Sequence, residues 1–564
     1  MILKEQNGKY IYSDGDTAEQ KMLKIATEYP EDLSQEYISQ NSEYLVNSTF
    51  SAVRQNILNW YPFKPNAEIL EIGAGMGSIT GMLCDKASYV TAVEMNPDRA
   101  AVIKARYPER ENLEIISENI FDWNTEKKFD YIIMIGVLEY AGVFSEQPDP
   151  YTSFLMRTRE LLKTGGRLLF AIENRFGIKY FLGASEDHLQ QPYVGIEGYK
   201  QPKTPRTFSK HELGEFIKGA GYNSNRFYYV YPDYKFPELI CTDEYAPSYS
   251  SLKKISFTYA KNSALVLDEK DIYKDLIEND VWQFMANSYL VEAWNSNQNE
   301  NTNEQKVYYV SAKGETQKKY RVSTVIMNDG YAYKIPMHSQ AEEHIQRIYE
   351  NTKCLKERGI SVLEVQQEGR YLKTQMFNGL SGEEYVSGLL EQNDKVGFFR
   401  VIELLRDTLL KTSELEFEKN ILSHITDSLE NYHIGPVLKD GYIDMTFYNC
   451  FYQDDKLLFY DQEWKFPNVP LNFILFYAVK SLYNRRKIKT QISFDEVMDF
   501  LGIGEERNLY DKLEEYIWSQ ILYRQTDFYG EDGYCNRFQE KITLSRKFQE
   551  IDERDVYKRQ IIYI

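Results

Sequence analysis

The sequence lacks long apolar runs and has few cysteines. Its 564 residues contain no stretch of about 18 consecutive apolar residues, and the N-terminus has no apolar core like that of a signal peptide. We therefore expect a soluble, cytoplasmic protein without a membrane-spanning segment. Since no Cys-x-x-Cys or Cys/His ligand spacing occurs, the thiols are expected to be reduced and a zinc site is disfavoured. The five cysteines are Cys84, Cys241, Cys354, Cys450 and Cys535.

The chain also lacks net positive charge. Its formal net charge is −19, and such a balance disfavours a general nucleic-acid or anionic-membrane surface. We therefore expect no nucleic-acid partner. The length exceeds that of one ordinary hydrophobic core, which predicts two or three domains.

A strand, a tight turn and a helix start are predicted over residues 67–80. A short apolar run indicates a buried parallel strand, and it ends at Gly73, Gly75 and Gly77. Glycine tolerates positive φ and lets the backbone approach a ligand, while the free N–H groups of the following helix add partial positive charge. We therefore expect this loop to hold a nucleotide-like ligand.

A second predicted strand, residues 88–94, ends in an acid. Glu94 follows Glu71 by 23 residues, the position from which an acid accepts hydrogen bonds from ribose hydroxyls in nucleotide-binding α/β units. Two ligands remain open at this point, a dinucleotide and S-adenosylmethionine. The dinucleotide fingerprint places its last glycine three residues after the second, whereas the spacing here is Gly-x-Gly-x-Gly.

The glycine segment resembles the first motif of class I S-adenosylmethionine-dependent methyltransferases. Three later segments, 119–123, 129–140 and 161–173, match that family in order. The resemblance implies a Rossmann-like α/β fold with a mostly parallel seven-stranded sheet, and S-adenosylmethionine as cofactor. The residues that it assigns to cofactor binding are Glu71, Gly73, Gly75, Gly77, Glu94, Met95, Asn119, Ile120 and Gly136.

The acceptor site is predicted to follow the strand that ends at Glu173. Ligands of open α/β sheets lie beyond the carboxyl ends of the strands, and the insertion after Glu173 begins there. A hydroxyl acceptor needs a base, for which His188 or Asp187 is the expected residue. A phosphate acceptor is already anionic and needs none. Its expected cationic partners are Arg175, Lys179 and Arg206.

The second half of the chain has a different pattern. Strand-like segments between residues 307 and 335 flank turn signals, which predicts an antiparallel sheet. Lys334 lies in the last of these segments. Asp444, Asn449 five residues later, and Asp461 twelve residues after that have the spacing of a kinase catalytic loop and metal-binding segment.

This pattern resembles the small-molecule and glycan kinases and implies an α+β protein-kinase-like domain. In that family Lys334 would hold the ATP phosphates, Asp444 would accept the substrate proton, and Asn449 and Asp461 would bind magnesium. Tyr442 stands where such kinases usually carry histidine, and no glycine-rich phosphate loop is evident. A non-catalytic kinase-like domain therefore stays open.

Five segments follow from these patterns. Residues 271–294 have a helical period, and an Asn/Gln-rich run follows them. The last residues resemble a translated sequencing adapter. The predicted segments are 1–65, an N-terminal hairpin at 9–16 with a helical cap; 66–265, the methyltransferase domain; 266–304, a helical segment and linker; 305–554, the kinase-like domain; and 555–564, a non-native tail.

A methyltransferase joined to a kinase-like domain resembles the bifunctional chain terminators of bacterial O-antigen synthesis. The resemblance implies methyl transfer to a sugar or phosphosugar in surface-polysaccharide synthesis, with a second domain that phosphorylates or binds the acceptor. Two other hypotheses are a methyltransferase whose kinase-like half only recruits polysaccharide-assembly proteins, and a small-molecule O- or N-methyltransferase unrelated to glycans. Fold alone does not decide among them.

Overall fold

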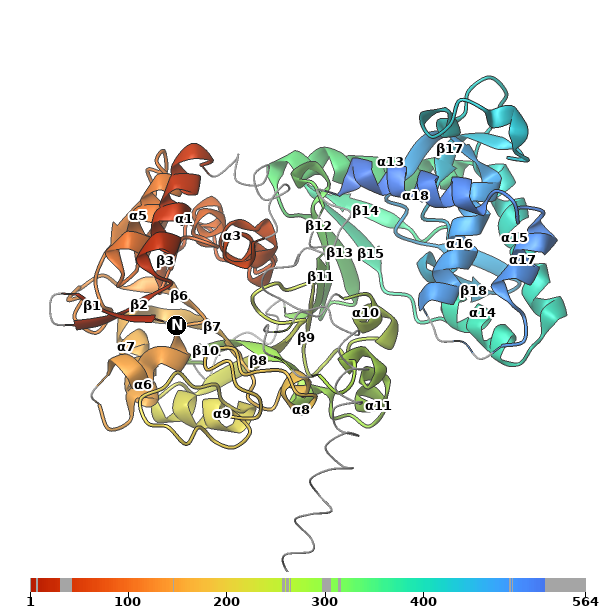
Figure 1. Cartoon of the computed structure of the whole chain (residues 1–564). Helices are drawn as coiled ribbons and strands as arrows, with labels where there is room; N and C mark the ends of the chain where they lie inside the picture. The colour runs from red at the N-terminus through yellow and green to blue at the C-terminus, as the bar shows by residue number, and fades with distance from the viewer. Residues whose placement is uncertain are drawn as a thin grey trace, which may run out of the picture. The chain divides into compact units, whose positions relative to one another are not determined.

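Two compact units make up the described part of the chain in this computed structural model (Figure 1). The first comprises the described residues up to 296 together with 308–312, and the second comprises 306–307 and 316–522. No helix among the described residues is long and apolar enough to cross a membrane. The predicted tail at 555–564 lies outside the described residues, as does most of the Asn/Gln-rich run. The described residues are 2–6, 9–30, 43–145, 147–255, 259, 263, 265–296, 306–312, 316–485, 488 and 490–522.

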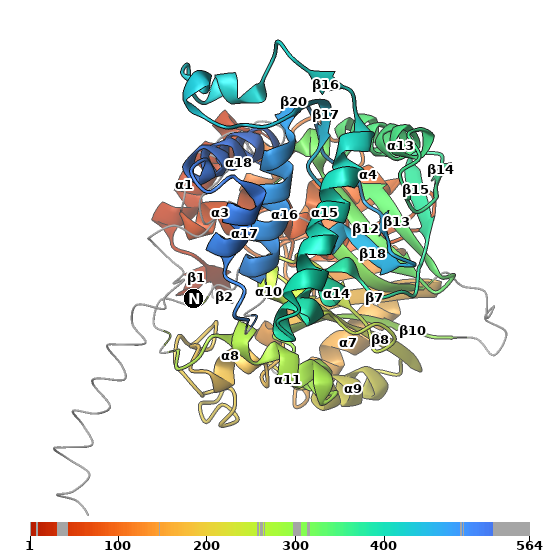
Figure 2. The ribbon, with the colours of Figure 1, turned by 90° about the vertical axis from the view of Figure 1, so that its right-hand side faces the viewer.

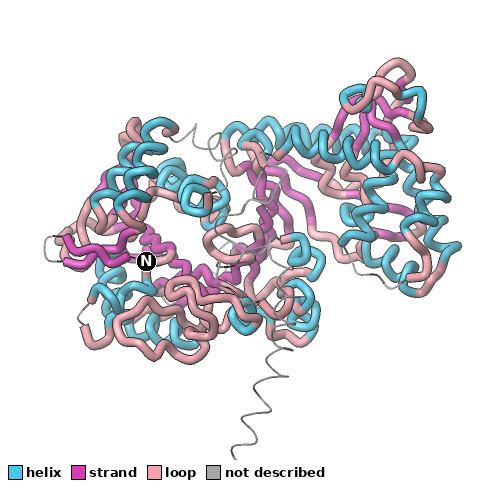
Figure 3. Tube along the Cα trace, in the orientation of Figure 1, coloured by secondary structure: helices cyan, strands magenta, loops and turns pink. Residues whose placement is uncertain are grey.

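A mixed sheet forms the centre of the first unit, in the strand order β11-β9-β8-β10-β7-β6-β3-β4-β5. The strands from β7 to β5 in this order are parallel to one another, whereas β10 pairs antiparallel with β7 and β8. Helices lie on both faces (Figure 3), which confirms the predicted Rossmann-like fold. The strands are β3 (Glu68–Ile72), β4 (Tyr89–Val93), β5 (Leu113–Ile116), β6 (Phe129–Ile135), β7 (Leu162–Glu173), β8 (Ser224–Tyr231), β9 (Leu239–Cys241), β10 (Ser288–Trp294) and β11 (Val307–Ala312), and the main helices are α4 (Thr80–Lys86), α5 (Pro97–Arg106), α7 (Pro150–Leu161) and α9 (Lys210–Gly219).

Strand β10 corrects the prediction that residues 271–294 are helical. Only α11 (Tyr273–Glu278) and α12 (Trp282–Met285) form α-helix there, and the segment from Ser288 onward is a strand. Val291 pairs with Phe170 of β7 on one side and with Phe227 of β8 on the other. Since β10 is buried on both faces, apolar residues occupy consecutive positions on either side of Glu292 and lack the alternation that marks a half-exposed strand.

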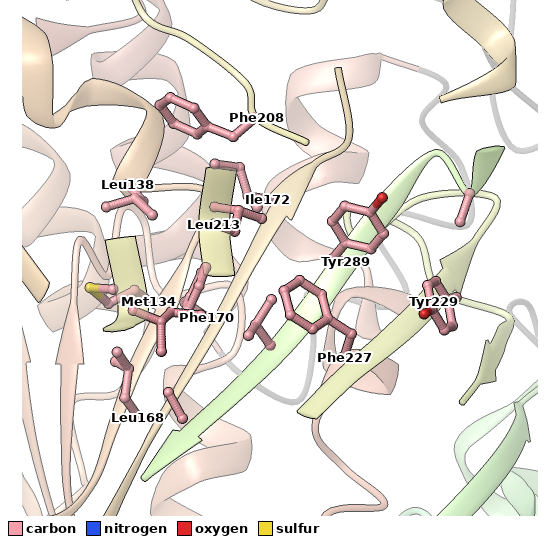
Figure 4. Close-up of a cluster of buried hydrophobic side chains, with 14 of the residues drawn as sticks. Met134, Leu138, Leu168, Phe170, Ile172, Phe208, Leu213, Phe227, Tyr229 and Tyr289 are labelled. Atoms are coloured by element: carbon pink, nitrogen blue, oxygen red, sulfur yellow. The ribbon is translucent and has the colours of Figure 1, made fainter. Parts of the chain in front are cut away.

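The core of the first unit packs between the sheet and helices on one of its faces (Figure 4). Met134 of β6, Phe170 of β7, Tyr289 of β10 and Leu213 of α9 belong to one buried apolar cluster. Each such side chain contributes about 1.5–3 kcal/mol of burial free energy. Ser209 is the N-cap of helix α9, and its side chain forms a capping box with Glu212.

The N-terminal hairpin differs from the predicted one. Strand β1 (Ile2–Gln6) pairs with β2 (Lys9–Ser13), so Lys9 begins the second strand of the hairpin. The Asp14-Gly15 pair leads into helix α1 (Asp16–Glu28), with Gly15 as its N-cap. Asp-Gly is permissive for positive φ in either place, which is why the dipeptide alone does not separate a hairpin turn from a helix start. Helices α1 and α3 (Tyr44–Phe50) then pack on α5 and the glycine loop.

The second unit pairs an antiparallel sheet with a helical core. Its sheet runs β14-β15-β13-β12, and α13 packs against it. Helix α16 contacts α15, α17 and α18 (Figure 2). The elements are β12 (Val322–Met327), β13 (Tyr331–Pro336), α13 (Glu342–Glu357), β14 (Val365–Glu368), β15 (Tyr371–Gln375), α14 (Gly382–Glu391), α15 (Lys395–Thr412), β16 (Leu415–Glu416), β17 (Val437–Tyr442), β18 (Cys450–Gln453), β19 (Lys456–Phe459), β20 (Lys465–Pro470), α16 (Leu471–Arg485), α17 (Phe494–Leu501) and α18 (Arg507–Ile521).

Candidate functional site

The glycine loop leaves β3 in the conformation that its sequence predicts. Gly73, Gly75 and Gly77 have φ of 67°, 61° and 80°, a region that costs non-glycine residues strain. A Cβ atom on Gly73 would lie 2.5 Å from Cγ2 of Val137. Conformation therefore disfavours larger residues at all three positions, and lack of space adds to this at Gly73.

A cavity of about 520 Å³ opens at the carboxyl ends of the parallel strands in the first unit. Gly77 does not line it and packs instead against Tyr107 and Ile103. His188 and Asp187, the predicted acceptor residues, line the same cavity as the glycine loop. The predicted cofactor residues that line it are Glu71, Gly73, Gly75, Glu94, Met95, Asn119, Ile120 and Gly136.

Glu94 joins the ends of β3 and β4. Its Oε2 atom accepts a hydrogen bond from the N–H of Gly75 (2.8 Å), and its Oε1 atom accepts one from the N–H of Asn96 (2.9 Å). Burial raises the pKa of the Glu94 carboxyl, although Arg99 and the two backbone bonds oppose that shift. The carboxylate thus fixes the loop, and a ribose hydroxyl would have to bind the same carboxylate oxygens as these two backbone N–H groups.

Glu71 is buried behind the glycine loop. Its Oε2 atom accepts a hydrogen bond from the Thr80 hydroxyl (2.6 Å). Burial raises the pKa of Glu71 to about 8, while the bond from Thr80 and the charge of Arg106 lower it only in part. Arg106 also donates hydrogen bonds to the carbonyls of Met76 and Gly77, so its buried guanidinium holds the glycine loop in place.

A cluster of buried charges closes the other end of the cavity. Lys235 forms an ion pair with Glu173 and lies 3.2 Å from Asp187. Asp187 also accepts hydrogen bonds from Lys179 (2.9 Å) and from the Tyr180 hydroxyl (2.5 Å). Burial would raise the pKa of Asp187, but the two lysines hold it well below its usual range. A carboxylate held in this way is a weak base.

His188 lies between two carboxylates in this cluster. Its Nδ1 atom is 2.8 Å from Oε1 of Glu186, and its Nε2 atom is 3.6 Å from Oε1 of Glu139. Burial would lower the pKa of His188, but Glu139 and Glu186 raise it well above its ordinary value. Burial raises the pKa of Glu139. Glu139 follows β6 at the same sheet edge as His188, and sequence reasoning missed it.

The three predicted phosphate ligands lie outside the cavity lining. Arg175 forms an ion pair with Glu212 (3.2 Å), and Lys179 forms one with Asp187. The guanidinium of Arg206 lies over the ring of Tyr199, 5.4 Å from its centroid. These contacts give no support to a phosphate acceptor in this cavity.

The second unit brings its four predicted residues together. Lys334 of β13 forms an ion pair with Asp461 and lies 3.1 Å from Glu463. Oδ2 of Asp444 accepts from the N–H groups of Glu463 (2.9 Å) and Trp464 (2.8 Å). Asn449 donates to the Asp444 carbonyl (3.3 Å), and Asp461 has φ of 55°. The four residues that the sequence pattern singled out therefore lie near one another in the structure. Their kinase-like role stays a prediction.

A methyltransferase domain model matches residues 70–168. An uncharacterized methyltransferase of Staphylococcus carnosus is 27% identical over 157 residues, covering 26% of this chain and 71% of that protein. Ribosomal RNA small subunit methyltransferase A of Fusobacterium nucleatum is 32% identical over 187 residues, covering 28% of this chain and 69% of that protein. This chain spans 20–50% of the length of other relatives that it matches.

A solved structure is also similar. It is a SAM-dependent methyltransferase and possible histamine N-methyltransferase from Thermotoga maritima, 15% identical, with a TM-score of 0.28 and coverage of 49% of this chain and 100% of that one.

Proposed function

Since this chain belongs to the class I S-adenosylmethionine-dependent methyltransferases, we propose that its first unit transfers a methyl group to an acceptor bound beside Glu139 and His188. The observation that supports this best is the shared cavity, which is lined both by the glycine loop and by these two residues. Donor and acceptor would then meet inside one cavity. Its volume of about 520 Å³ falls within the usual range for small-molecule sites.

The cofactor would lie along the strand ends. In this proposal the N–H groups of the loop from Gly73 to Gly77 face the methionine part, Glu94 binds the ribose hydroxyls, and Asn119 and Ile120 flank the adenine. Glu94 already accepts from Gly75, so cofactor binding and loop conformation would be linked. This arrangement leaves the methyl group directed at the charged end of the cavity.

The acceptor atom is proposed to be a hydroxyl oxygen. The oxygen attacks the methyl carbon, the carbon–sulfur bond breaks with its electron pair retained by sulfur, and the hydroxyl proton passes to the buried carboxylates. Orientation supplies much of the rate of such an in-line displacement. Glu139 is better suited to receive the proton than Asp187, because burial raises the pKa of Glu139 while two lysines lower that of Asp187.

A sugar or phosphosugar of bacterial surface-polysaccharide synthesis is the proposed acceptor, methylated in the cytoplasm. The second unit would phosphorylate or bind the same acceptor, with Lys334 on the ATP phosphates, Asp444 as proton acceptor, and Asn449 and Asp461 as magnesium ligands. The ion pair between Lys334 and Asp461 supports this assignment. Two alternatives are a second unit that recruits polysaccharide-assembly proteins without catalysis, and an acceptor unrelated to glycans.

Ribosomal RNA, named as the target of several relatives, is disfavoured as the acceptor here. The net charge of −19 opposes binding to a phosphate backbone. The buried carboxylates at the acceptor end of the cavity add further negative charge. Of the two proposed acceptors, a neutral sugar fits these charges better than an anionic phosphosugar.

Transfer of a labelled methyl group tests the proposal. Full-length protein is incubated with labelled S-adenosylmethionine and, in separate reactions, with neutral sugars, phosphosugars, amines and ribosomal RNA. Label in a sugar supports the proposal. Label confined to an amine or to RNA would overturn the sugar assignment, and absence of S-adenosylhomocysteine binding would overturn methyl transfer itself.

A further inference from the structure

Three potential metal ligands meet at the acceptor end of the cavity. Glu139, Glu173 and His188 each offer one ligand atom, and these atoms all lie within 4.8 Å of one another. Glu139 follows β6, Glu173 ends β7, and His188 lies in the insertion after it. Ligand atoms of one octahedral cation lie roughly 3 Å apart. Modest side-chain rotations would therefore bring these three ligand atoms close enough to bind one cation.

Glu139 is buried, and its carboxylate has no close hydrogen-bond donor. Its side chain is 1% exposed, and neither carboxylate oxygen has a donor within 3.5 Å among the described residues. The nearby Nε2 atom of His188 lies at 3.6 Å. A buried carboxylate without donors is costly unless something binds it. Glu139 lines the cavity, so a bound ligand can reach it.

His188 is oriented as metal-bound histidines commonly are. Its Nδ1 atom is held by Glu186 at 2.8 Å, which leaves Nε2 directed toward Glu139. A carboxylate on the far nitrogen of a ligating histidine fixes its tautomer and raises its basicity. Glu186 in turn accepts from the N–H groups of His188 and Leu189, so the carboxylate itself is fixed.

The charges around His188 leave an excess of negative charge. Five carboxylates with little exposure belong to its cluster, and two lysines contact three of them. With the histidine neutral, as a metal ligand must be, the carboxylates outnumber the lysines by three. A divalent cation would offset most of that excess. The carboxylates are those of Glu139, Glu173, Glu186, Asp187 and Asp233, and the lysines are Lys179 and Lys235.

We propose that Glu139, Glu173 and His188 bind a divalent cation that holds the oxygen of the methyl acceptor. This inference rests on the proposed function, and it narrows the acceptor to molecules that offer an oxygen ligand, such as sugars with neighbouring hydroxyls. A hydroxyl bound to a divalent cation is more acidic than a free one. With Glu139 bound to the cation, the proton of this more acidic hydroxyl passes to water in the cavity rather than to Glu139.

Binding of Mn²⁺ tests the site without any turnover. The electron paramagnetic resonance signal of free Mn²⁺ is followed during titration into the full-length chain, and into Glu139→Gln, His188→Ala and Asp461→Asn variants. Since the second unit is also proposed to bind a metal ion, Asp461→Asn isolates the site in the first unit. We expect that variant to keep a site, and we expect the double variant Glu139→Gln/Asp461→Asn to bind at least tenfold more weakly.

Control variants and a second ligand distinguish loss of the metal site from loss of the fold and from failure of the proposed function. Glu215→Gln and His211→Ala remove the same chemical groups from exposed positions on α9 and should leave Mn²⁺ binding unchanged. S-adenosylhomocysteine affinity, measured by calorimetry, should be retained by Glu139→Gln and so report an intact fold. Equal Mn²⁺ binding by Asp461→Asn and the double variant would overturn the metal site. Failure of the wild type to bind S-adenosylhomocysteine would overturn the proposed function whatever Mn²⁺ does.

Discussion

Glu94 has two roles at the residue scale, because the atoms that would bind ribose also hold the glycine loop. Its carboxylate accepts from Gly75 and Asn96. We expect Glu94→Ala to weaken S-adenosylhomocysteine binding by roughly tenfold or more, since each lost hydrogen bond to a charged group is worth about 1.5–3 kcal/mol. Isothermal titration calorimetry measures the change. The exposed Glu111→Ala serves as control, and unchanged affinity in Glu94→Ala would remove Glu94 from the site.

Glu71 makes stability depend on pH. Burial raises its pKa from 4.5 to about 8, so between these values the folded state binds more protons than the unfolded state. The free energy of unfolding therefore falls as the pH rises through that window. We expect Glu71→Gln to remove a fall of a few kcal/mol between about pH 5 and pH 8, measured by denaturant unfolding without ligand. The same pH slope in both proteins would contradict this assignment.

Strand β10 joins the parallel strands of the first sheet to its antiparallel strands, because it pairs with β7 on one side and β8 on the other. Val291 is fully buried at its centre. Val291→Ala removes two methyl groups from a packed site and should lower the free energy of unfolding by about 2 kcal/mol. Val281, 41% exposed just before α12, provides the matched Val281→Ala control. Equal thermal unfolding of the two variants would show that β10 is not part of the core.

Elements near the cofactor loop are predictable from local sequence patterns, whereas elements that depend on long-range pairing are not. The glycine loop and the two strands that follow it are predictable because apolar runs and glycine conformation are properties of neighbouring residues. Strand β10 is not, since its pairing partners lie far away in the chain and its buried run resembles a helix. The charge cluster is predictable only in part, because Asp187 and His188 follow from their place after a strand end whereas Glu139 does not. Glu139 and His188 meet only because two strand ends share one sheet edge.

On the scale of the whole molecule, we expect each unit to be stabilised by a different ligand. Lys334 forms ion pairs with Asp461 and Glu463 inside the second unit. We expect Lys334→Ala to abolish stabilisation by Mg·ATP and to leave stabilisation by S-adenosylhomocysteine intact, as followed by thermal unfolding. Lys353→Ala, on an exposed part of α13, is the control. Absence of any Mg·ATP effect in the wild type would instead favour a non-catalytic second unit.

Scanning calorimetry of the full chain with S-adenosylhomocysteine tests the central claim most directly. A ligand present at about 100 times its dissociation constant adds about 2.7 kcal/mol to the unit that binds it, and separate units can unfold in separate transitions. The account predicts that one transition moves upward with S-adenosylhomocysteine and that Glu94→Ala reduces the shift at the same concentration. Transitions that stay in place at saturating S-adenosylhomocysteine would contradict a methyl-donor site in the first unit.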